Sequence, residues 1–271
     1  MKEMSLEEIK STTIGVLNFI DEVCRQNELK YFLCGGTLLG AVRHNGFIPW
    51  DDDIDIMMPR KDYERLFEVW PENSYYMVRN HKNTSNFPYA YGKAFDSRTI
   101  KQEPIRKKCQ LIGVDVDIFP IDNLPNEKAE SQRLFNDVDR YTSIMSKHIY
   151  PLRLGIKSWK LNLKVLYGRF LELLCVESVD SVVRRISECA QRYAEAESDY
   201  CGITSISHYE MKEVNPKTNY SKTIFVVFEN RKYPAPIGFA DYLKRLYGEN
   251  YMQLPPVDKR QTHHTYKAYW K

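Results

Sequence analysis

The sequence lacks a long apolar run and any close pair of cysteines, and each absence excludes a class of protein. No hydrophobic stretch in its 271 residues approaches the ~20 needed to span a membrane. Its six cysteines are scattered without a C-x-x-C pair, and its start is charged, unlike an apolar signal peptide. We therefore expect a cytoplasmic protein with free thiols, in which the sequons at Asn83 and Asn219 are chance matches.

The charge balance is too even to indicate a polyanionic partner. The net charge is +3, and 43% of the residues are hydrophobic, as in an ordinary soluble globular protein. We therefore expect no nucleic-acid partner. The chain has no internal repeat and no low-complexity linker, so we expect one large domain or two small ones.

One segment departs from this balance, because residues 153–169 contain basic residues and no acid. The basic residues are Arg153, Lys157, Lys160, Lys164 and Arg169. On a helix the first four share one face, with apolar side chains nearby. Such a face could rest on an anionic membrane, at its cytoplasmic side, or carry a lipid-linked acceptor; a solvated basic helix face explains the pattern equally well.

Hydrophobic periodicity predicts an α/β (α+β) fold, with a mixed sheet flanked by helices. Ser5 and Glu8 form a capping box before a helix that we expect to end near residue 26 or 27. Further helices are predicted at residues 37–44, 59–70 and 237–247, and strands at residues 30–34, 53–58, 75–79, 89–95, 113–119 and 224–228. We expect Pro120 to end its strand. Residues 126–198 are predicted to be mainly helical, with a break near Pro151.

These elements divide the chain into three parts. Residues 1–122 are expected to form the catalytic core, and residues 123–215 a helical lobe that is appended to it or inserted. Residues 216–271 are expected to pack back on the core and complete the site.

The densest functional signal lies at residues 31–58, where a glycine pair precedes a run of acids. The acids are Asp51, Asp52, Asp53 and Asp55. Alternate residues of a strand share a face, so we expect Asp53 and Asp55 to point the same way while the isoleucines that follow them enter the core. Buried carboxylates are costly unless they are paired or ligated, and their oxygens suit Mg²⁺ or Mn²⁺. Taken alone, the pair would also fit a solvated acidic loop.

A second acidic strand favours a metal site over that loop. Asp115 and Asp117 alternate with Val114, Val116 and Ile118 in the same way. A cation held by carboxylates of the two strands would stabilise charge on phosphate oxygens and activate an attacking hydroxyl. Hydrolysis, nucleotidyl transfer and transfer of a substituted phosphate could all use such a site. A salt-bridged structural role stays open.

Several residues are candidates for phosphate contact. Gly35 and Gly36 open a helix after a strand, so backbone N–H groups can approach an anion, and Thr37 can cap this helix or touch the phosphate. As an isolated tripeptide, Gly-Gly-Thr fits an ordinary tight turn better. Arg43, on the same helix, and Lys93, near a strand end, could bind phosphate oxygens, although ordinary surface positions explain both equally well.

Four residues near the chain end or beside the acids are weaker candidates. Arg260, His263 and His264 could contact a nucleotide phosphate, but a solvated tail is the simpler interpretation. Trp50 could form part of an aromatic cage for a quaternary ammonium group, and core packing is slightly preferred for it.

The longer motifs resemble the LicD family of phosphocholine transferases. The resemblance rests on CGGTLLGAVR at residues 34–43, PWDDDIDI at residues 49–56 and VDIFPID at residues 116–122. A closing motif is similar too, from Pro234 through the Tyr247-Gly248 pair to Arg260 and His264. That family belongs to the nucleotidyltransferase-fold superfamily and is related to fukutin-type ribitol-phosphate transferases.

The resemblance implies a nucleotidyltransferase-like core, a reaction and residue roles. Phosphocholine would move from CDP-choline, or a related CDP-alcohol, to a hydroxyl of a cell-surface glycan or lipid-linked glycan such as a lipopolysaccharide, teichoic acid or capsule precursor, and CMP would leave. Asp53 and Asp55 match the paired ligands of Mg²⁺ or Mn²⁺, and Asp117 matches the third acid, with Asp115 the less favoured alternative. Asp51 would assist as a ligand or as the base for the acceptor. The Gly-Gly-Thr turn would face the phosphates.

Other functions remain open at this point. A CDP-ribitol or CDP-glycerol donor, or true nucleotidyl transfer, would use the same acids. A choline- or glycan-binding module without metal chemistry is the alternative outside the enzymes, and the complete set of acids argues against it. The cysteines lack the clustering of the zinc insertion in some fukutin-related enzymes. The resemblance therefore does not indicate which residues bind the acceptor.

Overall fold

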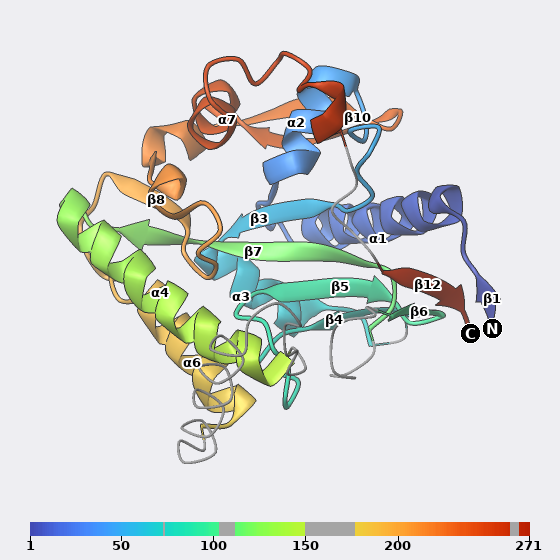
Figure 1. Ribbon diagram of the computed structural model, residues 1–271, viewed down its shortest axis with the longest axis horizontal. Helices are drawn as coiled ribbons and strands as arrows, with labels where there is room; N and C mark the ends of the chain where they lie inside the picture. Colours follow the sequence, from blue (N-terminus) through green and yellow to red (C-terminus); the bar gives the residue numbers. More distant parts are fainter. Residues whose placement is uncertain (73, 103–111, 150–176, 261–265) are drawn as a thin grey trace, which may run out of the picture.

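A computed structural model describes residues 1–72, 74–102, 112–149, 177–260 and 266–271 (Figure 1). The basic segment at residues 153–169, the break at Pro151 and the two histidines of the tail lie outside the described residues. Within the described parts, no helix combines the length and the apolar character that a membrane span requires.

A mixed sheet forms the centre of the molecule. Its main path is β2 (Phe32–Leu33), β3 (Asp55–Pro59), β7 (Asp115–Leu124), β5 (Gly92–Asp96) and β4 (Tyr76–Arg79). β3 and β7 are parallel, whereas the other neighbours on this path are antiparallel. β8 (Tyr200–Ile203) pairs with the second half of β7, and β9 (Asn215–Pro216) pairs with β8. The predicted α+β class is confirmed.

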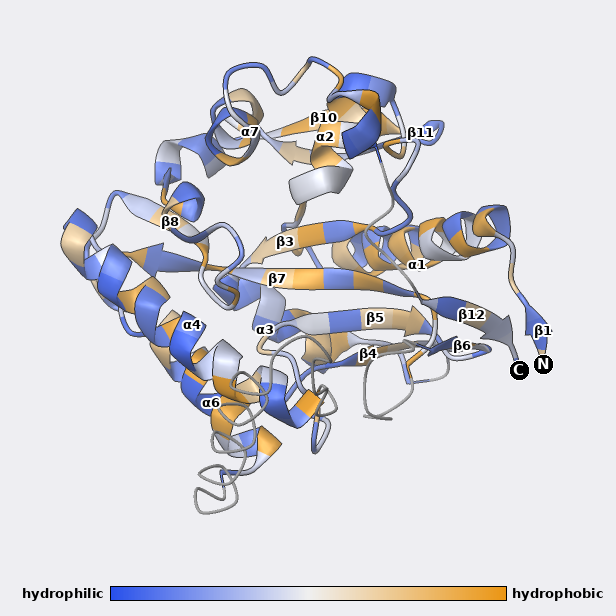
Figure 2. Cartoon of the chain, in the orientation of Figure 1, coloured by the Kyte–Doolittle hydropathy of each residue, from blue (hydrophilic) through white to orange (hydrophobic). Residues whose placement is uncertain are grey.

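Two helices, α1 (Leu6–Gln26) and α3 (Arg60–Val69), cover one face of this sheet. α1 begins with the predicted capping box: Ser5 Oγ accepts from Glu8 N at 3.2 Å, and the Glu8 carboxylate accepts from Ser5 N at 2.8 Å. It ends at Gln26, as expected. Its apolar stripe is fully buried at Val16 and Leu17, and Figure 2 shows the matching apolar colour along β3 and β7. Burial of this stripe, rather than intrinsic propensity, holds the helix on the sheet.

A second layer lies beyond the β2–β3 edge, at the top of Figure 1. It consists of α2 (Gly35–His44), α7 (Phe239–Tyr247) and the hairpin of β10 (Thr223–Phe228) with β11 (Arg231–Pro236). α2 contacts both α7 and β10, so these two C-terminal elements lie against a helix from the first part of the chain. α7 ends at Gly248, whose φ of +90° lies in the region that favours glycine.

The helical lobe consists, in its described part, of α4 (Lys128–Ile149) and α6 (Val179–Ala190). The two helices pack together around a core of their own, which includes Leu134, Phe135, Val138, Val182, Val183 and Ile186. Both helices lie at the end of the sheet opposite the chain termini (Figure 1).

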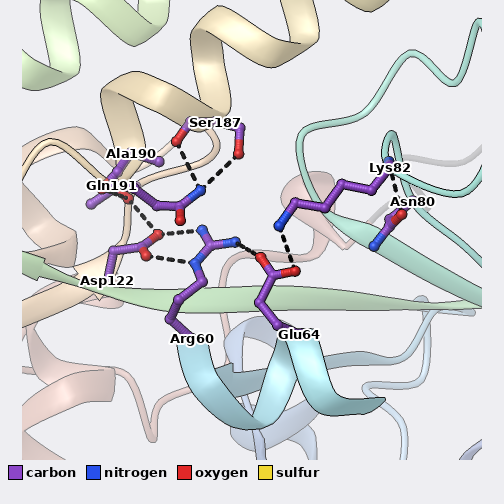
Figure 3. Close-up of polar contacts among 9 residues, drawn as sticks. Arg60, Glu64, Asn80, Lys82, Asp122, Ser187, Ala190 and Gln191 are labelled. Carbon is purple, nitrogen blue, oxygen red and sulfur yellow. Dashed lines mark hydrogen bonds and ion pairs between the residues drawn. The ribbon is translucent and has the colours of Figure 1, made fainter. Parts of the chain in front are cut away.

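An ion-pair network joins α3 to β7, and a hydrogen-bonded threonine links this network to the lobe (Figure 3). Asp122, on β7, accepts hydrogen bonds from Arg60 Nε at 2.7 Å and Nη2 at 2.6 Å, and Arg60 Nη1 also reaches Glu64 at 3.2 Å. The hydroxyl of Thr204 donates to Asp122 at 3.1 Å and lies 3.4 Å from the carbonyl of Ala190, the last residue of α6. Asp122 is 3% exposed, so its charge is taken up by this structural contact.

The prediction that Pro120 ends its strand was wrong. β7 continues through Pro120 to Leu124, because Pro120 lies between two partners on the same side: β5 pairs with residues 115–118 and β8 with residues 121–124. A missing N–H is tolerated in such a gap.

Some short strands were not predicted. β12 (Lys267–Trp270) pairs with β1 (Lys2–Glu3) and with β6 (Thr99–Gln102), which joins both chain ends to the middle of the sequence. Short 3-10 helices are present at Glu210–Glu213, Lys217–Tyr220 and Val257–Lys259.

Candidate active site

Three charged side chains form one row across the middle of the sheet. Asp55 on β3 is the register partner of Asp117 on β7, and Asp117 is in turn the partner of Lys93 on β5. Residues opposite one another on neighbouring strands project to the same face, so both carboxylates and the ammonium group share one side of the sheet. The Lys93 ammonium donates to Asp117 Oδ1.

The charged form of the Asp55 carboxyl is strongly disfavoured. Burial raises the pKa of its carboxyl well above the usual range, and the neighbouring carboxylates of Asp53, Asp117 and Asp51 raise it further, while Lys93 opposes them. Burial also raises the pKa of Asp117, against the lowering effect of Lys93. Four acids therefore lie close enough to repel one another, which is the condition that a bound cation relieves.

Asp53 lies in this group without belonging to the strand. β3 begins at Asp55, so the expected alternation from Asp53 to Asp55 along one strand is not present, although the isoleucines at 54 and 56 are fully buried as predicted. Asp53 and Asp51 reach the site from the loop before β3.

Asp115 is held in a different way. It accepts hydrogen bonds from Lys93 at 2.6 Å and from Lys101 at 2.7 Å. Burial acts to raise its pKa, but the two ammonium groups outweigh burial and lower the pKa below the usual range. The ring of Tyr266 covers Lys101, with the ammonium 4.2 Å from its centroid. Asp115 is thus neutralised by lysines, whereas Asp117 shares one lysine and remains 23% exposed.

The glycine turn borders the carboxylates directly. Gly35 has φ +52°, and a Cβ there would lie 3.4 Å from Asp55 Oδ2; a Cβ on Gly36 would lie 3.0 Å from Asp51 Oδ2. Glycine is favoured at position 35 by the positive φ and at position 36 by the close approach of the Asp51 carboxylate, and the sequence alone gave neither reason. Thr37 is buried, and its hydroxyl accepts a hydrogen bond from Asp55 N at 2.8 Å. The N-cap of α2 is the residue at 34, so Thr37 supports β3 and does not cap the helix.

Two predicted phosphate ligands are engaged with other groups. Lys93 is 5% exposed and bound to the acids described above. Arg43 Nη1 donates to the carbonyls of Tyr251 at 2.9 Å and Gln253 at 3.2 Å, and its Nε donates to His44. Arg43 therefore anchors the loop that follows α7 on the end of α2.

Trp50 is half-buried against the main core, in line with the slightly preferred interpretation. The Arg260 guanidinium lies 5.8 Å from its ring centroid, and the His44 ring packs edge-on at 6.4 Å. Arg260 Nε donates to the carbonyl of Pro255.

Sequence reasoning missed three tyrosines at the glycine turn. Tyr242 Oη accepts a hydrogen bond from Gly35 N at 3.3 Å, and Tyr247 Oη lies 3.9 Å from the position of a Gly35 Cβ. Tyr209 Oη lies 3.2 Å from Tyr247 Oη. The only available signal was the position of two of them in the closing motif, which carries no information on what their hydroxyls contact.

The donor set fits a divalent cation chemically. The oxygens are hard ligands, and their mutual repulsion at Asp55 would be relieved by positive charge. Across the part of the chain that the structure describes, no three ligand side chains are already gathered around one point, and Lys93 supplies the charge beside Asp117. The side chains of Asp53, Asp55 and Asp117 would have to turn toward one another to hold the ion.

Comparison with known proteins adds independent support for the motifs. A family model described as "LicD/FKTN/FKRP, nucleotidyltransferase domain" matches residues 28–155, which include the glycine turn and all the acids above. The chain is 30% identical over 286 residues to "Lipopolysaccharide cholinephosphotransferase LicD" of Haemophilus influenzae, covering 99% of each chain. It is 40% identical over 154 residues to an uncharacterized protein of Rickettsia typhi, covering 48% of each chain.

Proposed function

The chain belongs to the LicD family, and from this premise we propose that it is a transferase of phosphocholine, or of a similar phospho-alcohol. The donor is a CDP-activated alcohol, CDP-choline in the first place, and the acceptor is a hydroxyl of a cell-surface glycan or glycolipid precursor of the lipopolysaccharide type. CMP is the leaving product.

One observation supports this proposal above the others. The paired acids Asp55 and Asp117 lie directly opposite each other on parallel strands, and the Gly35–Gly36 turn lies against the carboxylates of Asp55 and Asp51. A pyrophosphate placed at the N-terminus of α2 would therefore meet backbone N–H groups and the acids together. No ordinary structural ion pair requires that arrangement.

Each residue then has a distinct task. Gly35 and Gly36 leave room for the phosphates, and Thr37 fixes the start of β3 so that Asp55 keeps its place. Asp51, beside Gly36, accepts the proton of the acceptor hydroxyl. Trp50 forms a wall against which the choline head group packs.

A divalent cation, Mg²⁺ or Mn²⁺, would be held by Asp53, Asp55 and Asp117. When bound, it would supply positive charge to the phosphate oxygens. Lys93 orients Asp117 and limits the net negative charge of the site before the anionic donor arrives.

The test is CMP release from CDP-choline by the purified chain, with and without Mg²⁺ and a lipopolysaccharide acceptor. Asp55→Asn and Asp117→Asn should each lower turnover at least about 100-fold. Asp199→Asn, an exposed aspartate outside the site, is the matched control and should not change it.

Each alternative has its own outcome. Faster CMP release from CDP-ribitol or CDP-glycerol would refute the choline assignment. Full turnover in both active-site variants would refute the site. Choline binding that Mg²⁺ leaves unchanged, with no turnover, would indicate a binding module instead.

A further inference from the structure

A pair of tyrosine hydroxyls flanks the glycine turn on the side of the acids. Tyr247 is the last residue of α7, and Tyr209 immediately precedes the 3-10 helix Glu210–Glu213. Their hydroxyl oxygens lie 3.2 Å apart and their rings pack edge to face at 6.0 Å. Residues from two distant segments thus meet at one point.

The position of this pair is fixed with respect to the turn. Tyr247 Oη lies 3.9 Å, and Asp55 Oδ2 3.4 Å, from the same point, the position of a Cβ on Gly35. Tyr242, one turn earlier on α7, accepts a hydrogen bond from Gly35 N, which ties the helix to the turn. The Tyr247 hydroxyl and the Asp55 carboxylate therefore both lie beside Gly35, and Tyr209 adjoins them through its contact with Tyr247.

The pair has an unused hydrogen-bond donor. Two hydroxyls carry two protons, and the hydrogen bond between them uses one. Within the described residues, no other hydrogen bond engages either hydroxyl. Burial raises the pKa of both tyrosines, and the negative charge of Asp55 raises it further, so both stay protonated at neutral pH. Both residues are half-buried, and one hydroxyl proton of the pair is left for a ligand within the described residues.

We propose that the Tyr209–Tyr247 pair donates a hydrogen bond to a phosphate oxygen of the donor nucleotide, in the space between Gly35 and Asp55. This proposal rests on the proposed function, because it assumes that a pyrophosphate lies at the turn. A neutral donor suits this place: an arginine or lysine would form an ion pair with Asp55, as Lys93 does with Asp117, whereas a hydroxyl remains available.

The pair is tested with Tyr247→Phe, Tyr209→Phe and the double variant. Tyr220→Phe is the matched control, because it removes a buried hydroxyl that makes no hydrogen bond to any described part of the chain. With CDP-choline, each single variant should lower kcat/KM about 10- to 100-fold, the range for a hydrogen bond to a charged group. The double variant should be no worse than the more impaired single variant, because the two hydroxyls act as one unit.

A second readout does not depend on the choline assignment. Calorimetry with inorganic pyrophosphate and Mg²⁺ should show at least about fivefold weaker binding by Tyr247→Phe and unchanged binding by Tyr220→Phe. Equal affinity of Tyr247→Phe and the native chain, or no binding by the native chain, would overturn the proposal. Weaker pyrophosphate binding by Tyr247→Phe, together with no turnover of CDP-choline by the native chain, would support the pair and refute the proposed donor.

Discussion

Glu213 is a buried acid for which the structure predicts a large dependence of stability on pH. It ends the 3-10 helix Glu210–Glu213 and is 1% exposed, and its Oε2 has no hydrogen-bond partner among the residues that the structure describes. Burial raises its pKa to about 8, and only a backbone hydrogen bond involving Ile203 opposes the shift. In the folded chain this carboxyl is therefore neutral at pH 7, whereas in the unfolded chain it is ionised.

The sign of the effect follows from proton binding. Between pH 4.5 and about 8 the folded state holds a proton at Glu213 that the unfolded state has lost, so stability falls as pH rises. The contribution of the protonated Glu213 carboxyl to the free energy of unfolding is complete below pH 4.5 and is lost as the pH rises through about 8. Each pH unit changes the folding equilibrium tenfold, so the whole interval corresponds to about 5 kcal/mol, an upper limit because local opening can hydrate the charge at lower cost.

Glu213→Gln isolates this effect, because glutamine keeps the shape and never ionises. Relative to the native chain, the variant should become more stable with each step in pH, until the difference levels off above about pH 8. Urea denaturation followed by tryptophan fluorescence from pH 5 to 9 gives both free energies of unfolding. All other titrating groups are common to the two proteins and cancel in the difference.

The control is Glu210→Gln, an exposed acid on the same 3-10 helix. It should follow the native profile at every pH. If the Glu213→Gln profile also ran parallel to the native one, Glu213 would not be a neutral acid in the folded state, and the argument from its burial would be refuted.

Three further substitutions test the rest of the structure. Asp122→Asn should lower the free energy of unfolding by about 3 kcal/mol, because it leaves Arg60 without its bidentate partner; hydrogen exchange should be faster in α6, and unchanged exchange there would contradict the link between lobe and sheet. Lys93→Met should cost about 3 kcal/mol in urea denaturation, because two carboxylates lose their shared cation, and native-like stability would contradict that network. Gly36→Ala should lower CMP release about tenfold at nearly constant melting temperature, because its Cβ would lie 3.0 Å from Asp51 Oδ2; full activity would show that this carboxylate moves freely.

The sequence predicted those elements whose stabilising contacts are local. The first helix was correct to its ends because a capping box and an apolar stripe mark it, and α7 was correct in its stop because Gly248 marks it. The error at Pro120 arose because the deciding contact is not local. Whether a strand tolerates proline depends on which partner lies beside it, and β8 comes from residues about 80 positions further along the chain. The same holds for β12, whose partners lie near the N-terminus and in the middle of the chain.

The distinction between local and long-range contacts also explains which residues of the site could be recognised from the sequence. Asp55 and Asp117 stood out because each acid is embedded among apolar residues, a pattern that a chain does not carry without a partner for the charge. The partner was not visible, because the register that sets Lys93 opposite Asp117 is a property of β5 and β7 together. A lysine predicted to bind phosphate is therefore bound to a carboxylate. For the proposed pyrophosphate donor, Lys93 therefore does not supply a free positive charge, and a cation at the acids or the N–H groups of α2 would supply it instead. This is why a neutral hydroxyl pair beside the turn is a more suitable additional ligand than another basic side chain.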